Sequence, residues 1–204
     1  MNKYVRWIIF LFCLFIFSFI AMKVYTDGEI LIDNIIYDFI SRYFISDGMT
    51  NTFMIITWFG GTIGIVLMCI ISLFIFRHKK INTLIVINLI IVTVLNNLLK
   101  IIFMRVRPDI NPMVIETSYA FPSGHSMISI AFYGYLIYNI LLYFNNKNIK
   151  WILTFLLSIL VFLIGISRIY LGVHYASDVI GGFCFGVVYL IIYIYLCRKI
   201  LKDL

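Results

Sequence analysis

Charged residues are scarce in this chain, and their scarcity excludes a soluble globular domain. They make up 12% of the 204 residues, whereas apolar residues make up 63% and the mean hydropathy is +1.06. The surface of a soluble domain usually carries roughly 25–35% charged residues. We therefore expect a lipid bilayer to be the solvent for most of the chain. The length suits one domain, and we predict that residues 1–204 form a single transmembrane domain.

Cysteine is also scarce, and its placement excludes two kinds of site. The cysteines show no C-x-x-C spacing, so the sequence indicates neither a zinc site nor a disulfide framework. Each lies within or beside an apolar segment, where a thiol packs as a small apolar side chain. The four are Cys13, Cys69, Cys184 and Cys197. The net charge of +7 does not indicate nucleic-acid binding, because the cations gather at the ends of apolar runs, where they set membrane topology.

Six segments are long and apolar enough to cross a membrane as helices, which takes about 20 residues. They are residues 5–22, 52–76, 82–103, 124–144, 151–169 and 178–197. The sequence thus predicts an all-α fold, an integral membrane bundle of six transmembrane helices. Lys3 and Arg6 precede the first segment as they would in a signal peptide. Its apolar run is long for that, and no A-x-A-like cleavage site follows, so we expect a retained span.

Two of the predicted spans contain glycines four residues apart. Gly60 and Gly64 lie in the second span, and Gly182 and Gly186 lie in the sixth. Small residues one turn apart can let two membrane helices approach closely. Tolerance of glycine inside a membrane helix explains the pattern equally well, so both interpretations stand.

The connection after the first span, residues 23–50, predicts an amphipathic interfacial helix. Its apolar side chains recur at near-helical spacing, opposite Asp33 and Asp38. Such a helix lies on the membrane surface. It could guide a lipid toward a site or cap the end of the bundle, and we favour the capping role.

The distribution of cations predicts the orientation. One set of termini and connections carries ten Lys and Arg residues and one acid, whereas the opposite set carries six cations and eight acids. Cytoplasmic loops carry the excess of Lys and Arg. We therefore expect a multi-pass protein of the cell membrane with both termini in the cytoplasm. Three polar clusters fall on the opposite, extracytoplasmic side.

The first polar cluster contains Lys100, Arg107 and Pro108, at the end of the third predicted span. Pro108 disfavours helix just before itself, so we expect the chain to leave the membrane here. Lys100 would then extend toward the interface. Two topology-setting cations would belong on the cytoplasmic side, yet charge counting places these outside, which favours a functional role.

The second cluster, Pro122-Ser123-Gly124-His125, opens the fourth predicted span. Ser123 suits an N-cap, and Gly124 lets a ligand approach the backbone closely. The free amides of a helix start favour an anion, so a phosphate could bind here. Taken alone, the motif is also an ordinary helix start.

The third cluster joins Ser167 and Arg168, at the end of the fifth span, to His174 and Asp178 beside the sixth. The i, i+4 spacing would let Asp178 accept a hydrogen bond from one ring nitrogen of His174. The other nitrogen could then act as a nucleophile. The alternative is an interfacial histidine next to a helix-starting acid. Taken together, the clusters supply the cations, histidines and carboxylate needed to bind a phosphate and move it onto histidine.

The three clusters carry a resemblance to a known family. In order and spacing they match K-x6-R-P, P-S-G-H and S-R-x5-H-x3-D, the signatures of the type-2 phosphatidic acid phosphatase superfamily, at eleven positions without a departure. The motif-bearing core covers about residues 95–190. The connecting sequence is similar to that of small bacterial phosphatidylglycerophosphate phosphatases of the B type, and relatives of this size hydrolyse undecaprenyl diphosphate.

The resemblance implies a role for each motif residue. His174 would attack phosphorus and form a phosphohistidine, Asp178 would orient it, and His125 would protonate the leaving group and later activate water. The phosphoryl oxygens would be held by Lys100, Arg107, Ser123, Gly124 and Arg168. The family needs no metal and no other cofactor.

Other polar residues of the outer side receive weaker interpretations. Arg105, Asp109 and Glu116 could read a headgroup, but we favour a solvated loop for each. Asn96 and Asn97 are expected to make interhelical hydrogen bonds rather than to contact substrate.

The leading hypothesis is a metal-independent membrane lipid phosphatase with an extracytoplasmic site. The alternatives are a protein that binds or flips a lipid phosphate without hydrolysing it and a catalytically inactive lipid-binding member. Phosphatidylglycerophosphate, undecaprenyl diphosphate and phosphatidic acid all fit as substrates, and the sequence makes no prediction of the oligomeric state.

Overall fold

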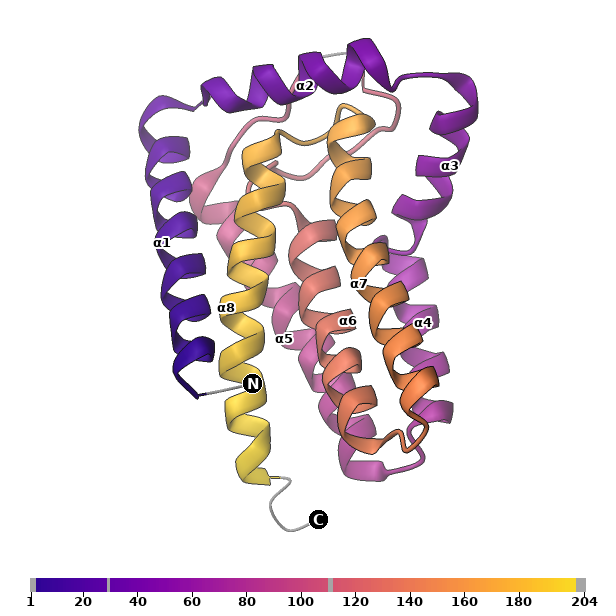
Figure 1. Cartoon of the computed structure of the whole chain (residues 1–204). Helices are drawn as coiled ribbons and strands as arrows, with labels where there is room; N and C mark the ends of the chain where they lie inside the picture. The colour runs from indigo at the N-terminus through magenta and orange to yellow at the C-terminus, as the bar shows by residue number, and fades with distance from the viewer. Residues whose placement is uncertain (1–2, 29, 110–111, 201–204) are drawn as a thin grey trace.

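The protein is built from helices that run along one common axis, with one helix lying across their end (Figure 1). The structure is a computed structural model that describes residues 3–28, 30–109 and 112–200. Glu29, Lys202 and Asp203, which entered the orientation argument, lie outside these ranges. Within them the chain forms eight helices and no strand. These are α1 (Lys3–Asp27), α2 (Leu31–Tyr43), α3 (Asp47–Trp58), α4 (Thr62–Ile75), α5 (Lys79–Phe103), α6 (Gly124–Tyr143), α7 (Lys147–Tyr170) and α8 (Ala176–Ile200).

The predicted all-α membrane bundle is confirmed, whereas one of its spans differs from the prediction. Five helices, α1, α5, α6, α7 and α8, are long and apolar enough to cross a membrane. The predicted continuous helix over residues 52–76 is wrong, because α3 and α4 meet at a bend of 53°. Counted together as one broken span, they make the sixth crossing.

Glycine explains the bend between α3 and α4. A Cβ on Gly64 would lie 2.1 Å from the carbonyl oxygen of Trp58, and one on Gly60 would lie 2.4 Å from the side chain of Ile164. No larger residue fits either position without a shift. The Gly60–Gly64 pair therefore shapes the break within a span rather than the packing of one straight helix on another.

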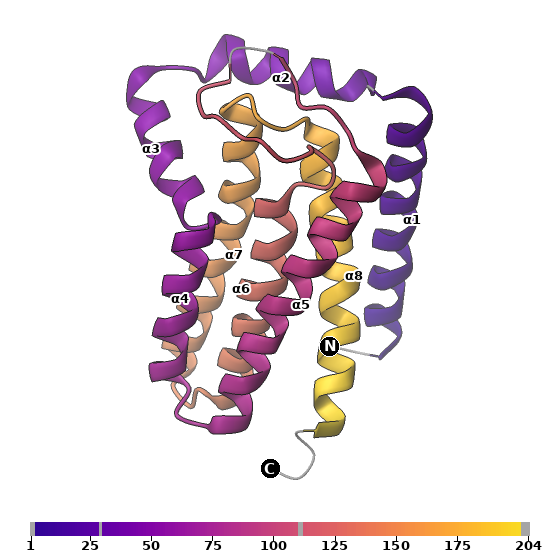
Figure 2. The ribbon, with the colours of Figure 1, turned by 180° about the vertical axis from the view of Figure 1, so that it is seen from behind.

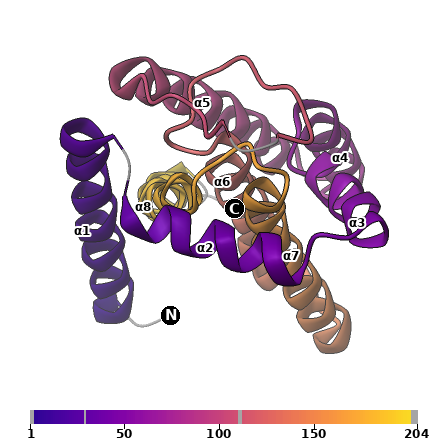
Figure 3. The same ribbon diagram turned by 90° about the horizontal axis from the view of Figure 1, so that it is seen from above.

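Helix α6 occupies the middle of the bundle and packs against α5, α7 and α8 (Figure 3). Its buried residues include Met127, Ala131, Phe132 and Tyr135. The glycines of α8 serve this packing as the close-approach interpretation predicted. A Cβ on Gly182 would lie 2.8 Å from the carbonyl oxygen of Ser123, so α8 touches the backbone at the start of α6.

Helix α2 lies across the end of the bundle, over α7 and α8 (Figures 1 and 3). Ile36, Tyr37 and Ile40 pack against Ile169, Ala176 and Val179 beneath. Helix α2 therefore covers this end of the bundle, in agreement with the capping interpretation. The predicted outward direction of Asp33 is wrong, because this side chain is buried at 1% exposure and points into the bundle.

Residues 104–109 and 112–123, in the connection from α5 to α6, lie beneath α2 at the same end (Figure 2). The described start of α1 and the described end of α8 lie at the opposite end of the bundle (Figure 1). Helix α5 stops at Phe103 because Met104 adopts a left-handed conformation, with φ 44°. Helix α6 then begins at Gly124, after the N-cap residue Ser123, whose side chain accepts a hydrogen bond from the amide of Ser126. The bundle thus gathers several helix ends and one long loop beneath α2.

Candidate active site

The three polar clusters of the sequence meet at the end of the bundle that α2 covers. Beside them lies a cavity of about 510 Å³. Five of the eight predicted site residues line it, namely Lys100, Arg107, Gly124, His125 and His174. Ser123, Arg168 and Asp178 are buried next to these residues rather than in the cavity wall.

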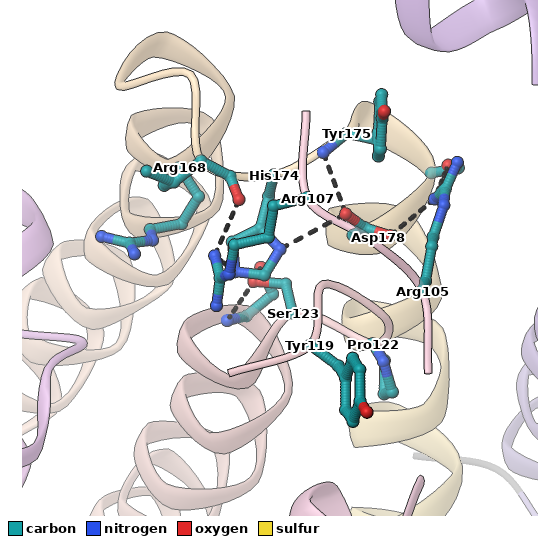
Figure 4. A network of polar contacts seen from close by, with 12 residues as sticks. Arg105, Arg107, Tyr119, Pro122, Ser123, Arg168, His174, Tyr175 and Asp178 are labelled. Atoms are coloured by element: carbon teal, nitrogen blue, oxygen red, sulfur yellow. Dashed lines mark hydrogen bonds and ion pairs between the residues drawn. The ribbon is translucent and has the colours of Figure 1, made fainter. Parts of the chain in front are cut away.

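His174 and Asp178 form the predicted pair (Figure 4). Nδ1 of His174 lies 3.3 Å from Oδ2 of Asp178, and the same oxygen accepts a hydrogen bond from the amide of Tyr175 at 2.9 Å. Both side chains are buried, at 2% and 0% exposure. The turn between α7 and α8 places the histidine one helical turn before the carboxylate, as the i, i+4 spacing predicted.

Arg107 holds the other side of the imidazole. Its Nη1 lies 3.2 Å from Nε2 of His174 and donates to the carbonyl of Val173 at 2.7 Å, while its Nε donates to the carbonyl of Ser118 at 2.6 Å. A guanidinium can only donate, so Nε2 accepts and Nδ1 carries the proton that Asp178 receives as a hydrogen bond. The network therefore assigns the tautomer that leaves the Nε2 lone pair free of a proton.

Burial reinforces this neutral state of His174. Loss of water around the ring lowers its pKa well below the ordinary value, and the nearby cations of Arg107, Arg168 and Lys100 lower it further. Burial also lowers the pKa of Arg107, against the opposing effect of Glu116 and Asp178. An arginine remains charged after such a shift. A neutral imidazole thus faces a permanent cation.

Arg168 completes a cluster of cations around the cavity. Its guanidinium, 2% exposed, donates to Oγ1 of Thr57 at 2.8 Å and pairs with Glu116. The other oxygen of Glu116 lies 3.7 Å from Nη2 of Arg107. A carboxylate thus bridges the two arginines that were predicted to bind phosphate.

Lys100 points inward from the end of α5. It is 6% exposed, and its Nζ donates to Oγ of Ser118 at 3.2 Å and to the carbonyl of Tyr119. The ammonium is therefore buried among loop residues at the end of α5, and its extension toward the membrane interface stays a prediction. The loop that follows α5 folds back over the end of the helix and provides polar partners that keep the ammonium inside the site.

The start of α6 faces the same cavity. A Cβ on Gly124 would lie 3.0 Å from Oδ1 of Asn96, so this position admits no side chain without a shift. His125, one residue further on, lies against the bend between α3 and α4, where a Cβ on Gly61 would be 3.6 Å from its Nε2. Ser123 is less available than predicted, because its amide donates to the carbonyl of Asp178 at 3.0 Å and its hydroxyl caps the helix.

The predicted interhelical hydrogen bond of Asn96 is confirmed. Its Nδ2 donates to the carbonyl of Pro122 at 3.3 Å and contacts the sulfur of Met127 at 3.4 Å. Both Asn96 and Asn97 also line the cavity.

Two residues assigned to a solvated loop belong to the site. Arg105 is 5% exposed and donates to Asp178 at 2.6 Å, and Glu116 pairs with Arg168 and Arg107. Asp109 is exposed, as predicted. A signal for Arg105 was present, since a second arginine two residues before Arg107 is a costly residue in so apolar a chain. No sequence signal indicated that Arg105 would pair with Asp33, which lies far away in the sequence.

Comparisons with known proteins show which sequences this chain resembles. A model of the PAP2 superfamily matches residues 81–202. The chain is 45% identical over 94 residues to phosphatidylglycerophosphatase B of Bacillus subtilis and 33% identical over 116 residues to an undecaprenyl-diphosphatase of Sulfolobus acidocaldarius. These matches cover 45% and 54% of this chain and 46% and 52% of the relatives, so the chain spans about half the length of the curated relatives it matches.

Solved structures show the same fold. The crystal structure of a transmembrane PAP2-type phosphatidylglycerolphosphate phosphatase from Bacillus subtilis superposes with a TM-score of 0.81 at 26% identity, covering 95% of this chain and 98% of that one. Aquifex aeolicus LpxE has the same fold, with a TM-score of 0.65 at 24% identity over 83% of this chain and 98% of its own. These findings and the five to six apolar helices support a multi-pass membrane protein. The matched region covers more than half of the chain and contains all three signatures, and the chain therefore belongs to the PAP2 superfamily.

Proposed function

We propose that this protein is a lipid phosphatase of the cell membrane that transfers a phosphoryl group to His174 and then to water. One observation carries the proposal. The unprotonated Nε2 of a buried histidine, oriented by Asp178, faces a cavity surrounded by the cations of Lys100, Arg107 and Arg168. A nucleophile beside a cluster of cations is the arrangement that phosphoryl transfer requires.

In the first step, the lone pair of Nε2 of His174 attacks phosphorus and forms a P–N bond. The bond between phosphorus and the lipid oxygen breaks, and that oxygen takes a proton from His125, which lines the same cavity. The imidazole ring becomes a phosphorylated cation. Asp178 stabilises this cation through its hydrogen bond to Nδ1.

In the second step, His125 removes a proton from a water molecule, which attacks phosphorus and breaks the P–N bond. Inorganic phosphate leaves, and Nε2 recovers its lone pair. The phosphoryl group would take the place of the Glu116 carboxylate, which bridges Arg168 and Arg107 in this structure. Atoms and charges then balance over one turnover.

Cations provide the charge stabilisation in this proposal. Phosphate-ester hydrolysis is among the slowest uncatalysed reactions, so groups that stabilise the transferring phosphoryl must provide most of the acceleration. Lys100, Arg107 and Arg168 meet that need at a site that excludes most water. Within the described residues, no three His, Cys, Asp or Glu side chains gather as metal ligands. We therefore propose that turnover is independent of divalent metal ions.

The wall of the cavity supports a lipid substrate. Apolar residues of α4 and α5 form it below the polar residues, among them Val66, Ile90 and Val94. These three are 46%, 57% and 52% exposed on the outside of the bundle, where membrane lipid would contact them. An acyl or isoprenoid chain can therefore lie along α4 and α5 while its phosphate reaches His174. The names of the curated relatives suggest phosphatidylglycerophosphate and undecaprenyl diphosphate as candidates.

The orientation belongs to the proposal as well. The site lies at the end of the bundle opposite the described start of α1 and end of α8 (Figure 1). With the cation-rich ends in the cytoplasm, the site faces away from the cytoplasm. A lipid phosphate made on the inner leaflet would then have to cross the bilayer before hydrolysis.

Release of inorganic phosphate by the purified protein in detergent tests the function. We expect turnover of at least one of phosphatidylglycerophosphate, undecaprenyl diphosphate and phosphatidic acid, assayed side by side. His174→Ala should abolish it and prevent trapping of ³²P-labelled phosphohistidine. His78→Ala is the matched control, because His78 is exposed at the start of α5. Binding without release by the wild type would indicate a carrier instead, and normal release by His174→Ala would refute the assigned nucleophile.

A further inference from the structure

A buried ion-pair network links the interfacial helix α2 to the catalytic carboxylate. Nη1 of Arg105 donates to Oδ1 of Asp178 at 2.6 Å and to Oγ of Ser177 at 2.8 Å, while its Nη2 donates to Oδ2 of Asp33 at 2.8 Å. The side chains of Arg105, Asp33 and Asp178 are 3%, 1% and 0% exposed. One guanidinium therefore joins two carboxylates that lie more than a hundred residues apart in sequence.

Further hydrogen bonds within the network restrain the side chain of Arg105. Asp33 accepts from the amide of Ser177 at 2.8 Å and from its hydroxyl at 2.7 Å, directly beside Asp178 in the chain. Nε of Arg105 donates to the carbonyl of Gly28 at 3.0 Å, and its guanidinium lies 4.2 Å from the centre of the Tyr175 ring. Four of the five N–H groups of Arg105 thus have partners.

The two oxygens of Asp178 have different partners. Oδ1 accepts from Arg105, whereas Oδ2 faces Nδ1 of His174 and the amide of Tyr175 (Figure 4). Rotation of the carboxylate would break both sets of contacts. In addition, a buried carboxylate keeps its charge only if it is paired, and Arg105 is the cation that contacts Asp178 directly.

From this geometry we infer that Arg105 and Asp33 are positioning residues for catalysis: Asp33 fixes Arg105, and Arg105 fixes the charged Asp178 that orients His174. Neither residue lines the cavity beside His174, so neither contacts the phosphoryl group. This inference rests on the proposed function. It adds that helix α2, beyond covering the bundle, contributes a side chain on which the reactivity of His174 depends.

The alternative is that the ion pairs only anchor α2. Buried ion pairs are weak evidence for stability, and replacing one often costs little. A purely structural role predicts that activity falls only as the amount of folded protein falls. A positioning role predicts a lower kcat in protein that remains folded, with KM nearly unchanged, because substrate binding does not involve Arg105.

Chemical rescue distinguishes the two roles. Arg105 also borders a second cavity of about 480 Å³, through which a small ion can reach the space that Arg105→Ala leaves. We expect Arg105→Ala to lower kcat by about 10–100-fold, the range for loss of an outer partner of a site residue. Millimolar guanidinium chloride should restore part of kcat, whereas urea at equal concentration should not. Arg42→Ala is the matched control, because Arg42 on α2 is 74% exposed and forms an ion pair with the exposed Asp38 of its own helix, 3.9 Å away.

A gentler variant covers the case in which Arg105→Ala does not fold. Asp33→Asn keeps the shape of the side chain and removes its charge, and we expect a smaller loss of kcat with the same KM. Asp38→Asn, exposed on the same helix, should behave as wild type. The loss in Asp33→Asn combined with Arg105→Gln should be less than the product of the single losses, because both act through Asp178.

The tautomer of His174 gives a readout that does not need turnover. In ¹⁵N-histidine-labelled protein, assigned with His174→Gln, the wild type should show a protonated Nδ1, and Asp33→Asn should weaken this preference. The inference would be overturned if the folded variants kept the wild-type tautomer and a kcat within about twofold of wild type. A change that small is below the range expected for loss of an outer partner of a site residue. If instead the wild type releases no phosphate, the proposed function fails, and the tautomer measurement still decides whether Arg105 and Asp33 orient the histidine.

Discussion

Replacing Gly182 with alanine would place a methyl group between α8 and the first turn of α6. The new Cβ would lie 2.8 Å from the carbonyl oxygen of Ser123, 3.0 Å from Cβ of Ser126 and 3.3 Å from the amide nitrogen of Met127. The closest of these atoms belongs to the backbone and cannot rotate away. Ser123 and the helix start that it caps must therefore move.

The expected cost combines two opposing effects. Overpacking a close contact costs about 1–3 kcal/mol, whereas alanine in a helix gains about 0.5–1 kcal/mol over glycine. We expect a net loss of about 1–2 kcal/mol, equivalent to a fall of about 2–4 °C in melting temperature for each kcal/mol at this chain length. The shift should also raise KM, because the amide of Ser123 donates to the backbone carbonyl of Asp178 at 3.0 Å and the next residue, Gly124, lines the cavity.

Two other glycines serve as controls in thermal unfolding and phosphate-release assays in detergent. Gly48→Ala meets no atom within 4 Å in the first turn of α3, so it should be as stable as the wild type or slightly more stable. Gly186→Ala would lie 3.0 Å from the carbonyl oxygen of Met127, one turn further from the site. It should lose stability with little change in KM. If Gly182→Ala matched the wild type in both assays, the close packing of α8 on α6 would be refuted.

Acid should destabilise the fold through His174, because its lowered pKa leaves the folded state with fewer bound protons than the unfolded chain below pH 6.5. Between pH 7.5 and 5.5 the stability lost through His174 amounts to about 1.4 kcal/mol. The melting temperature of His174→Asn should therefore fall less over this range than that of the wild type. An equal fall in the two proteins would contradict a buried neutral histidine. In sealed right-side-out vesicles, a membrane-impermeant maleimide should label Asp109→Cys but not Asn145→Cys. The reverse pattern would show that the proposed orientation of the protein is wrong. Turnover should survive EDTA, and a strict, reversible requirement for a divalent ion would overturn the cation-based mechanism.

The sequence predicted the parts of the fold that depend on local patterns. Apolar length alone located α1, α5, α6, α7 and α8 to within a few residues at most ends, because a membrane helix satisfies its backbone internally and needs little tertiary context. The same criterion missed the bend that Gly60 and Gly64 shape. Hydropathy averages over a window and does not register two glycines at which a side chain would collide with Ile164 or with the carbonyl of Trp58.

The site was predictable where its residues share a motif. His174 and Asp178 lie on one turn, so their spacing implies their contact, and the cations of the signatures lie at helix ends on one side. The partners of Arg105 were not predictable. Asp33 lies on an amphipathic helix whose apolar pattern indicated that this acid faces outward. Its burial depends on how α2 sits over α8, and no local pattern encodes that placement.

The length of α6 has a consequence for the free-energy cost of bringing a lipid phosphate to the site. Twenty residues at about 1.5 Å each give this helix a length close to the roughly 30 Å of the hydrocarbon core. The proposed phosphate site begins at the first residue of this helix, Gly124, which would place it at headgroup depth rather than above the membrane. Each methylene group lifted into water would cost about 0.8 kcal/mol. In the proposed function, a lipid substrate that lies along α4 and α5 would reach His174 from the side and keep its chains in the bilayer, so no extraction cost would add to the chemical barrier.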